Sequence, residues 1–94
     1  QAALETLACV AYREPISKIE IDELRGVNSI FSLRSLSIRG LIEEIVPPES
    51  KDAKIKRYRT TIDFLKKLGI EKVSDLPNYE EFSRISQNDE QSDS

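Results

Sequence analysis

The stretch IDELRGVNSIFSLRSLSIRGLIEE, residues 21 to 44, constrains this chain more than any other part of it. Two segments with helical spacing flank Gly26, and the second ends at Gly40, where the strand-like run LIEEIV begins. Glycine readily takes the left-handed conformation that closes a helix, so both glycines predict helix C-termini. A turn of about three residues between two helices is the length of a helix-turn-helix.

The two helices of this unit have recognisable starts. Ser17 and Glu20 form a capping-box pattern, which predicts a helix over residues 18–25. Its inward face would hold Ile21 and Leu24, with Ile19 close by. Asn28 is a good N-cap residue for the next helix, which the pattern extends to Gly40.

The segment before this unit predicts a further helix over residues 2–12, which Pro15 prevents from continuing. One face at helical spacing consists of Leu4, Leu7, Ala8 and Ala11. The opposite side offers Ala3, Thr6 and Val10, so the helix is apolar nearly all round. Either alanine simply tolerates exposure, or a partner or further domain packs on the second face.

The segment after the unit predicts a β-hairpin, with strands over residues 41–46 and 55–60 joined by the loop PPESKDAK. Thr60 and Asp63 then fit a helix cap, and a helix over 61–69 would close at Gly69. A looser apolar series could pack back on the core: Ile70, Val73, Leu76, Tyr79 and Phe82.

This order of elements predicts a mainly α fold with a small β-hairpin, the α+β class called a winged helix-turn-helix. The domain would span residues 1–82. Residues 83–94 are polar and acidic with almost nothing to bury, and we expect them to be a disordered tail.

Composition excludes several function classes. The chain of 94 residues has no His and a single Cys, so the usual zinc sites and the commonest general base are missing. We therefore expect no enzyme activity, no metal and no cofactor. Cys9 lies in an apolar run and is interpreted as a buried small hydrophobe rather than a reactive thiol.

No apolar run approaches the roughly 20 residues that span a bilayer, and no signal peptide opens the chain, so a cytoplasmic location is expected. The start without Met suggests an excised domain or processed fragment.

Several spaced motifs carry a resemblance to a known family. These are QAALETLACVAYREPISKIEIDELRGVNS, LRSLSIRGLIEE, and YRTTIDFLKKLG followed by VSDLP. Over about residues 1–82 the chain resembles the second winged-helix domain of segregation and condensation protein B, a bacterial chromosome-partition factor. The resemblance implies a non-enzymatic, nucleoid-associated subunit of the SMC–kleisin complex for chromosome condensation and segregation.

The family also implies partners. Its members resemble one another in having two tandem winged-helix domains, and they form homodimers largely through the first domain, which would be absent here. They bind the kleisin subunit, segregation and condensation protein A, and through it the SMC ATPase.

The helix after Asn28 decides between a protein partner and DNA. Leu33 and Leu36 are its natural core contacts, and the opposite side shows four larger residues beside Ser35: Ile30, Phe31, Arg34 and Ile38. A major-groove reader needs hydrogen-bonding side chains, whereas exposed apolar groups favour a protein groove or helix. The alternative is that Ile30 and Phe31 pack under the first helix or the wing.

The wing supports the opposite hypothesis. Residues 51–67 carry seven basic residues against two acids, and residues 68–94 carry seven acids against two bases. Five basic side chains could contact DNA phosphates or an acidic partner: Lys51, Lys54, Lys56, Arg57 and Arg59. Five such contacts would give a log–log salt slope of about −4 to −5. If these contacts form, the protein would be a DNA-binding winged helix that acts as a transcriptional regulator or makes a nonspecific DNA contact. The commoner explanation of such a segment is a basic hairpin that is simply solvated.

Overall fold

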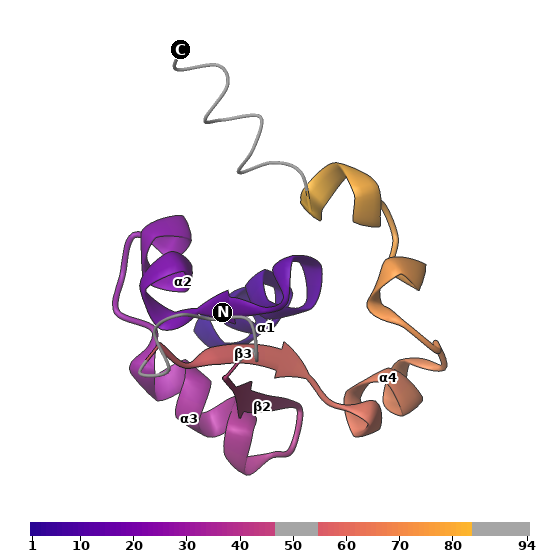
Figure 1. Cartoon of the computed structure of the whole chain (residues 1–94), viewed down its shortest axis with the longest axis horizontal. Coiled ribbons are helices and arrows are strands. Elements are labelled where there is room, and N and C mark those ends of the chain that lie inside the picture. The colour runs from indigo at the N-terminus through magenta and orange to yellow at the C-terminus, as the bar shows by residue number, and fades with distance from the viewer. Residues whose placement is uncertain (47–54, 84–94) are drawn as a thin grey trace.

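The computed structural model describes residues 1–46 and 55–83 (Figure 1). The hairpin loop with Lys51 and Lys54, and the predicted tail from residue 84 on, lie outside this range. The elements follow in the order α1 (Ala2–Arg13), β1 (Ile16–Ser17), α2 (Lys18–Arg25), α3 (Ile30–Ile38), β2 (Ile42–Ile45), β3 (Arg57–Thr60), α4 (Ile62–Leu68) and the 3₁₀ turn η1 (Val73–Asp75). A further helical segment covers residues 79–83.

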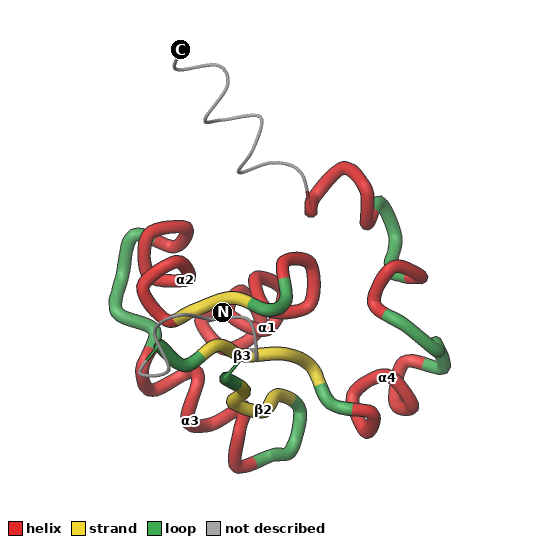
Figure 2. Tube along the Cα trace, viewed as in Figure 1, coloured by secondary structure: helices red, strands yellow, loops and turns green. Residues whose placement is uncertain are grey.

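The strands form one antiparallel sheet in the order β1-β3-β2. The hairpin pairs Ile42 with Thr60 and Glu43 with Arg59, which confirms its two predicted strands. The strand β1, where Ile16 pairs with Tyr58, was not predicted because two residues after a proline are too short to show an alternating pattern. Figure 2 shows α1, α2 and α3 grouped around this sheet, with α4 beyond the end of β3. The architecture is α+β and winged-helix-like, as the sequence predicts.

The core lies where the first three helices meet the sheet. Leu33 and Leu36 of α3 are fully buried there, as predicted, beside Val10 of α1 and Ile21 of α2. The sheet contributes Ile16, Ile42 and Tyr58 to the same cluster. The helix-turn-helix is therefore fixed by apolar contacts with the strands as well as by its own turn.

The structure shows which side of the nearly all-apolar helix α1 faces the core. The structure buries Thr6, Val10 and Ala11, whereas Leu4 is 65% exposed and Ala8 is also exposed. Thr6 can be buried because its hydroxyl donates to the Ala2 carbonyl oxygen at 2.9 Å, which satisfies the polar group within the helix.

A correction applies to the inward face predicted for α2. Ile21 is buried as predicted, but Leu24 is exposed and Ile19 is 68% exposed. A helix of only eight residues turns a narrow stripe toward the core, so its other apolar residues face outward.

The helix-turn-helix turn closes largely as the sequence predicts. The Ser17–Glu20 capping box is present, and Gly26 takes the left-handed conformation at φ 72°. The N-cap of α3 is Ser29 rather than Asn28. Asn28 still contributes, because its Oδ1 accepts a hydrogen bond from the Ile30 backbone N–H at 2.9 Å.

The cap of α4 lies one residue later than predicted. Thr61 Oγ1 accepts from the Phe64 N–H at 3.2 Å and donates to the Gly40 carbonyl oxygen at 2.6 Å. Thr60 is instead the buried last residue of β3. Its backbone N–H and hydroxyl both donate to Glu14 Oε1, at 2.9 and 2.6 Å. The helix ends at Gly69 in the left-handed conformation, as predicted.

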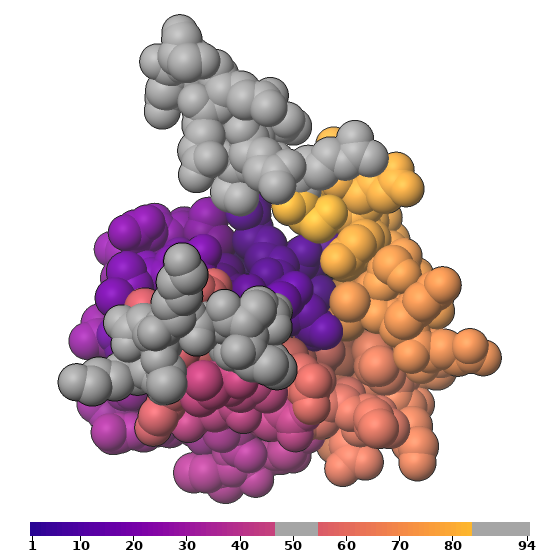
Figure 3. Space-filling model, in the orientation of Figure 1, coloured from indigo at the N-terminus to yellow at the C-terminus, as the bar shows by residue number. Residues whose placement is uncertain are grey.

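The predicted apolar series after α4 does pack back on the domain. Tyr12 of α1 stacks on Tyr79 with ring centroids 6.1 Å apart, and meets Phe82 edge-on at 5.4 Å. The Tyr12 hydroxyl also donates to the Pro77 carbonyl oxygen at 2.9 Å. Residues 70–83 therefore return to the C-terminal end of α1, as the orange and yellow surface in Figure 3 shows.

Candidate partner-binding surface

The outward side of α3 is apolar. Phe31 is 79% exposed and Ile38 is 85% exposed, with exposed Arg34 between them in the helix. The alternative that packs Phe31 under the first helix or the wing is therefore wrong. Ile30 differs from the prediction, because it is half-buried. The outward surface consists of Phe31, Arg34 and Ile38, and we call it the α3 surface.

The charge on this surface is positive. The segment from residue 28 to residue 40 contains Arg34 and Arg39 but no acidic residue. Neither arginine forms a side-chain hydrogen bond or ion pair with another of the residues that the structure describes. A partner that covers Phe31 and Ile38 could therefore place a carboxylate against Arg34 without displacing an acidic residue of this chain.

The basic side chains of the hairpin, unlike Arg34 and Arg39, lie beside carboxylates of this chain. Arg59 Nε lies 2.7 Å from Glu43 Oε2, Lys56 Nζ lies 3.5 Å from Glu44, and Arg57 Nη1 lies 3.3 Å from Glu20. Each described cation of the predicted patch thus has a carboxylate beside it. These carboxylates would repel a phosphate and compete with it for the cations.

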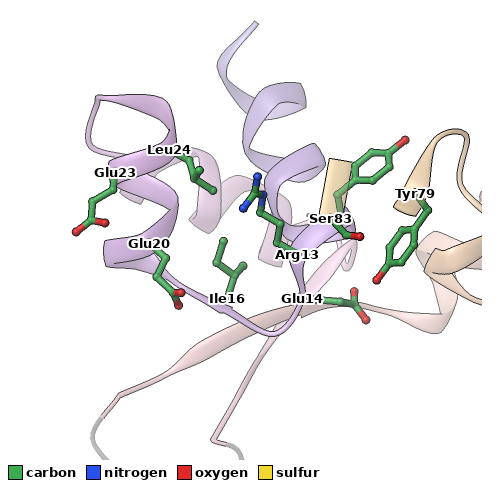
Figure 4. Close-up of a pocket in the computed structure, with 9 residues that line it drawn as sticks. Arg13, Glu14, Ile16, Glu20, Glu23, Leu24, Tyr79 and Ser83 are labelled. Carbon is green, nitrogen blue, oxygen red and sulfur yellow. The ribbon is translucent and has the colours of Figure 1, made fainter. Parts of the chain in front are cut away.

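A hollow of about 420 Å³ lies between α1, α2 and the C-terminal segment. Figure 4 shows Glu20 and Glu23 on one side of it and Tyr79 on the other. Glu14 and Glu20, two of its carboxylates, already bind Thr60 and Arg57. Periodicity and local motifs could not reveal this hollow, because its walls come from segments far apart in the chain.

The charged lining of the hollow includes three carboxylates, Glu14, Glu20 and Glu23. Its lining contains neither His nor Cys. Over residues 1–46 and 55–83, no group of three or more metal-ligating side chains comes together.

Cys9 is half-buried against the core. Burial raises the pKa of its thiol, although Arg25 and Arg13 partly oppose this, so the thiol is protonated at neutral pH. Within residues 1–46 and 55–83, no helix has the length and apolar character to cross a membrane.

Comparison with known proteins gives a consistent family. The family model described as segregation and condensation complex subunit ScpB matches residues 1–79. A segregation and condensation protein B from Pediococcus pentosaceus is 43% identical over 89 residues, which cover 95% of this chain and 45% of that protein. Its counterpart from Lactobacillus delbrueckii subsp. bulgaricus is 50% identical over 84 residues, 87% of this chain and 40% of the relative.

Solved structures agree with the sequence comparison. The crystal structure of ScpB from Mycobacterium tuberculosis superposes with a TM-score of 0.68 at 42% identity, covering 76% of this chain and 43% of that one. A conserved hypothetical protein from Chlorobium tepidum gives a TM-score of 0.62 at 37% identity, covering 72% and 41%. The chain spans less than half the length of each of these relatives. Because the family model matches most of its sequence and the fold agrees, this chain belongs to the ScpB family of segregation and condensation complex subunits.

Proposed function

We propose that this chain is a non-catalytic, protein-binding module of the bacterial SMC–kleisin complex for chromosome condensation and segregation. Residues 1–82 act as one winged-helix domain, and the protein works in the cytoplasm on the nucleoid. The domain binds the kleisin subunit, segregation and condensation protein A, and through it SMC. Homodimers of the full-length protein form mostly through a different domain. The contact with the kleisin is made by the α3 surface.

The observation that carries this proposal is the exposure of Phe31 and Ile38 on one side of α3. Residues seven apart lie on the same face of a helix, about 10 Å apart along its axis. Full burial of each side chain would contribute about 1.5–3 kcal/mol. A partner helix or extended segment that spans two helical turns can cover both and meet Arg34 between them.

A DNA-binding winged helix is the second candidate. The observation in its favour is that Arg34 on α3 and Arg39 at its C-cap have no ion pairs among the described residues. Against it stand the exposed Phe31 and Ile38, which cannot hydrogen-bond to base edges. The described hairpin cations are also paired with carboxylates, and the net charge of the chain is −3.

Titration calorimetry with the central region of the kleisin tests the proposal. Phe31→Glu and Ile38→Glu should each raise the Kd at least about tenfold, which corresponds to about 1.4 kcal/mol. Ile19→Glu is the matched control, because Ile19 is comparably exposed but lies on α2. It should leave the Kd unchanged.

A parallel titration with duplex DNA separates the two candidates. We expect weak binding at about 50 mM salt and its loss at about 200 mM. Tight DNA binding that falls with Arg34→Ala, together with kleisin binding that ignores Phe31→Glu, would establish the second candidate in place of the first.

A further inference from the structure

We infer that α1 carries a self-complementary surface through which two copies of this chain pair, helix against antiparallel helix, about a two-fold axis. This surface is separate from the α3 surface and does not rest on the proposed function.

The surface is the side of α1 that faces away from the core. Leu4 is 65% exposed and Ala8 is exposed, and both share a row at i, i+4, i+8 with half-buried Tyr12. Beside this row lies an open groove of about 340 Å³. Ala8, Cys9, Tyr12, Arg13 and Phe82 line it, and among these described residues only Arg13 is charged.

The apolar row is symmetric about Ala8. Leu4 lies four residues before Ala8, and Tyr12 lies four residues after it. When two such helices cross antiparallel between Ala8 and Cys9, Leu4 of each copy lies within about 1.5 Å, along the helix axis, of Tyr12 of the other. An exposed leucine then enters the groove beside Tyr12 and Phe82, which buries an apolar side chain that water now surrounds.

The charged row has the same symmetry about Cys9. Glu5 lies four residues before Cys9 and Arg13 lies four residues after it, so a two-fold axis between Ala8 and Cys9 leaves each Glu5 within about 1.5 Å, along the helix axis, of the partner's Arg13. Within the described part of the chain, Arg13 has no hydrogen bond or ion pair. Glu5 has only two long contacts, at 3.5 Å to the N-terminal amine and 3.6 Å to Arg25. Arg13 is therefore available for a partner, whereas Glu5 would exchange these two contacts for the partner's Arg13.

The partner that fits this surface is a second copy of the chain rather than an unrelated protein. Each apolar or charged side chain of the surface has its complementary side chain on the same helix. An isologous two-fold interface requires this self-complementarity. The small, exposed Ala8 beside the crossing point allows the helix axes to approach to about 8–10 Å.

The association should be weak. The twelve residues of α1 make a helix about 18 Å long. A single pair of such helices buries less than the roughly 1,200 Å² of a standard stable interface. We expect a Kd for dimerisation between about 1 µM and about 1 mM.

Sedimentation equilibrium from about 10 µM to about 1 mM tests the inference. The natural chain should pass from monomer to dimer over this range. Leu4→Glu should raise the dimer Kd at least tenfold, whereas Ile19→Glu, an equally exposed change on α2, should not alter it. A chain that stays monomeric throughout, or a dimer that ignores Leu4→Glu, overturns the inference.

A charge exchange tests the antiparallel arrangement itself. Arg13→Glu and Glu5→Arg should each weaken self-association, because each places like charges opposite one another. A mixture of the two variants should form heterodimers, since both cross-pairs then join Arg to Glu, and the double variant should recover self-association. A mixture that remains monomeric overturns the arrangement. Glu5 also lies near Arg25, so circular dichroism checks the fold of each variant, and Leu4→Glu gives a test that does not depend on that contact.

Discussion

At the scale of single residues, Asp22 joins the two helices of the helix-turn-helix. Its Oδ1 accepts from the Ser29 backbone N–H at 2.8 Å, and its Oδ2 pairs with Lys18. Ser29 is fully buried at the start of α3, so its N–H would have no solvent to replace this acceptor. Burial alone would raise the pKa of Asp22, but the hydrogen bonds from Lys18 and Ser29 lower it below its ordinary value.

Asp22→Ala should lower the free energy of unfolding by about 1–3 kcal/mol, because it leaves the buried N–H unpaired. A carboxyl group with a depressed folded-state pKa stabilises the fold above its unfolded pKa of about 3.9, and this contribution is lost as the pH falls through the folded pKa. Urea unfolding at pH 7 and pH 3 measures both effects.

Between pH 7 and pH 3, the free energy of unfolding should fall less in Asp22→Ala than in the natural chain. Glu23→Ala, which removes an exposed carboxylate from the neighbouring position, is the control. An unchanged pH dependence in Asp22→Ala would show that another carboxylate is responsible.

At the level of secondary-structure elements, carboxylates of strand β2 neutralise basic side chains on the other arm of the hairpin. Glu43 and Arg59 are directly opposite one another across β2 and β3, and Glu44 and Lys56 extend the row of ion pairs. Exposed ion pairs of this kind add little stability. Their larger effect is electrostatic, because they offset the positive field that a basic hairpin would present to nucleic acid.

Replacing Glu20, Glu43 and Glu44 together by Gln should release Lys56, Arg57 and Arg59 and raise the affinity for duplex DNA at low salt. Each new phosphate contact steepens the log–log salt slope by about 0.9, so three would add nearly three units. Fluorescence anisotropy at several salt concentrations measures the slope. Gln at position 20 can keep the capping box, so the fold of α2 is preserved.

The matched control removes three carboxylates elsewhere, by Glu23→Gln, Glu71→Gln and Glu81→Gln. Both triple variants have the same net charge. An equal gain in DNA affinity would mean that net charge acts alone and that the ion pairs of the hairpin have no special part.

At the scale of the whole molecule, Tyr12 connects the C-terminal segment to the winged-helix core. Its ring contacts Tyr79 and Phe82, and its hydroxyl reaches the Pro77 carbonyl oxygen. The segment of residues 70–83 has few buried side chains of its own, since its apolar residues are half-buried or exposed. A segment with so few buried contacts opens more readily than the core.

Tyr12→Ala should destabilise the fold by about 1–3 kcal/mol, because it removes two aromatic contacts and their burial. Hydrogen exchange should rise in residues 70–83 more than in α3. Tyr12→Phe keeps both ring contacts and removes one hydrogen bond, so it should cost about 1 kcal/mol or less. Uniform exchange across the domain in Tyr12→Ala would show that the segment unfolds only together with the core.

Features that depend on local chemistry could be predicted from the order of residues alone. The Ser17–Glu20 capping box, the left-handed Gly26 and Gly69, and the inward Leu33 and Leu36 all follow from residues within one or two helical turns of each other. The spaced motifs also determined the family, because they lie in the printed order of residues. The apolar side of α3 could be predicted for Phe31 and Ile38 from their positions opposite the two leucines.

Features that depend on distant partners became visible only in the folded chain. Thr6 instead of Leu4 faces the core because α2, α3 and the sheet lie on that side of α1. The strand β1 exists only because β3, far along the chain, pairs with it. The same holds for Thr60, whose hydroxyl is bound by Glu14, and for the carboxylates that pair with the hairpin cations. Such contacts join residues far apart in the chain, and local propensity and periodicity carry no information about them.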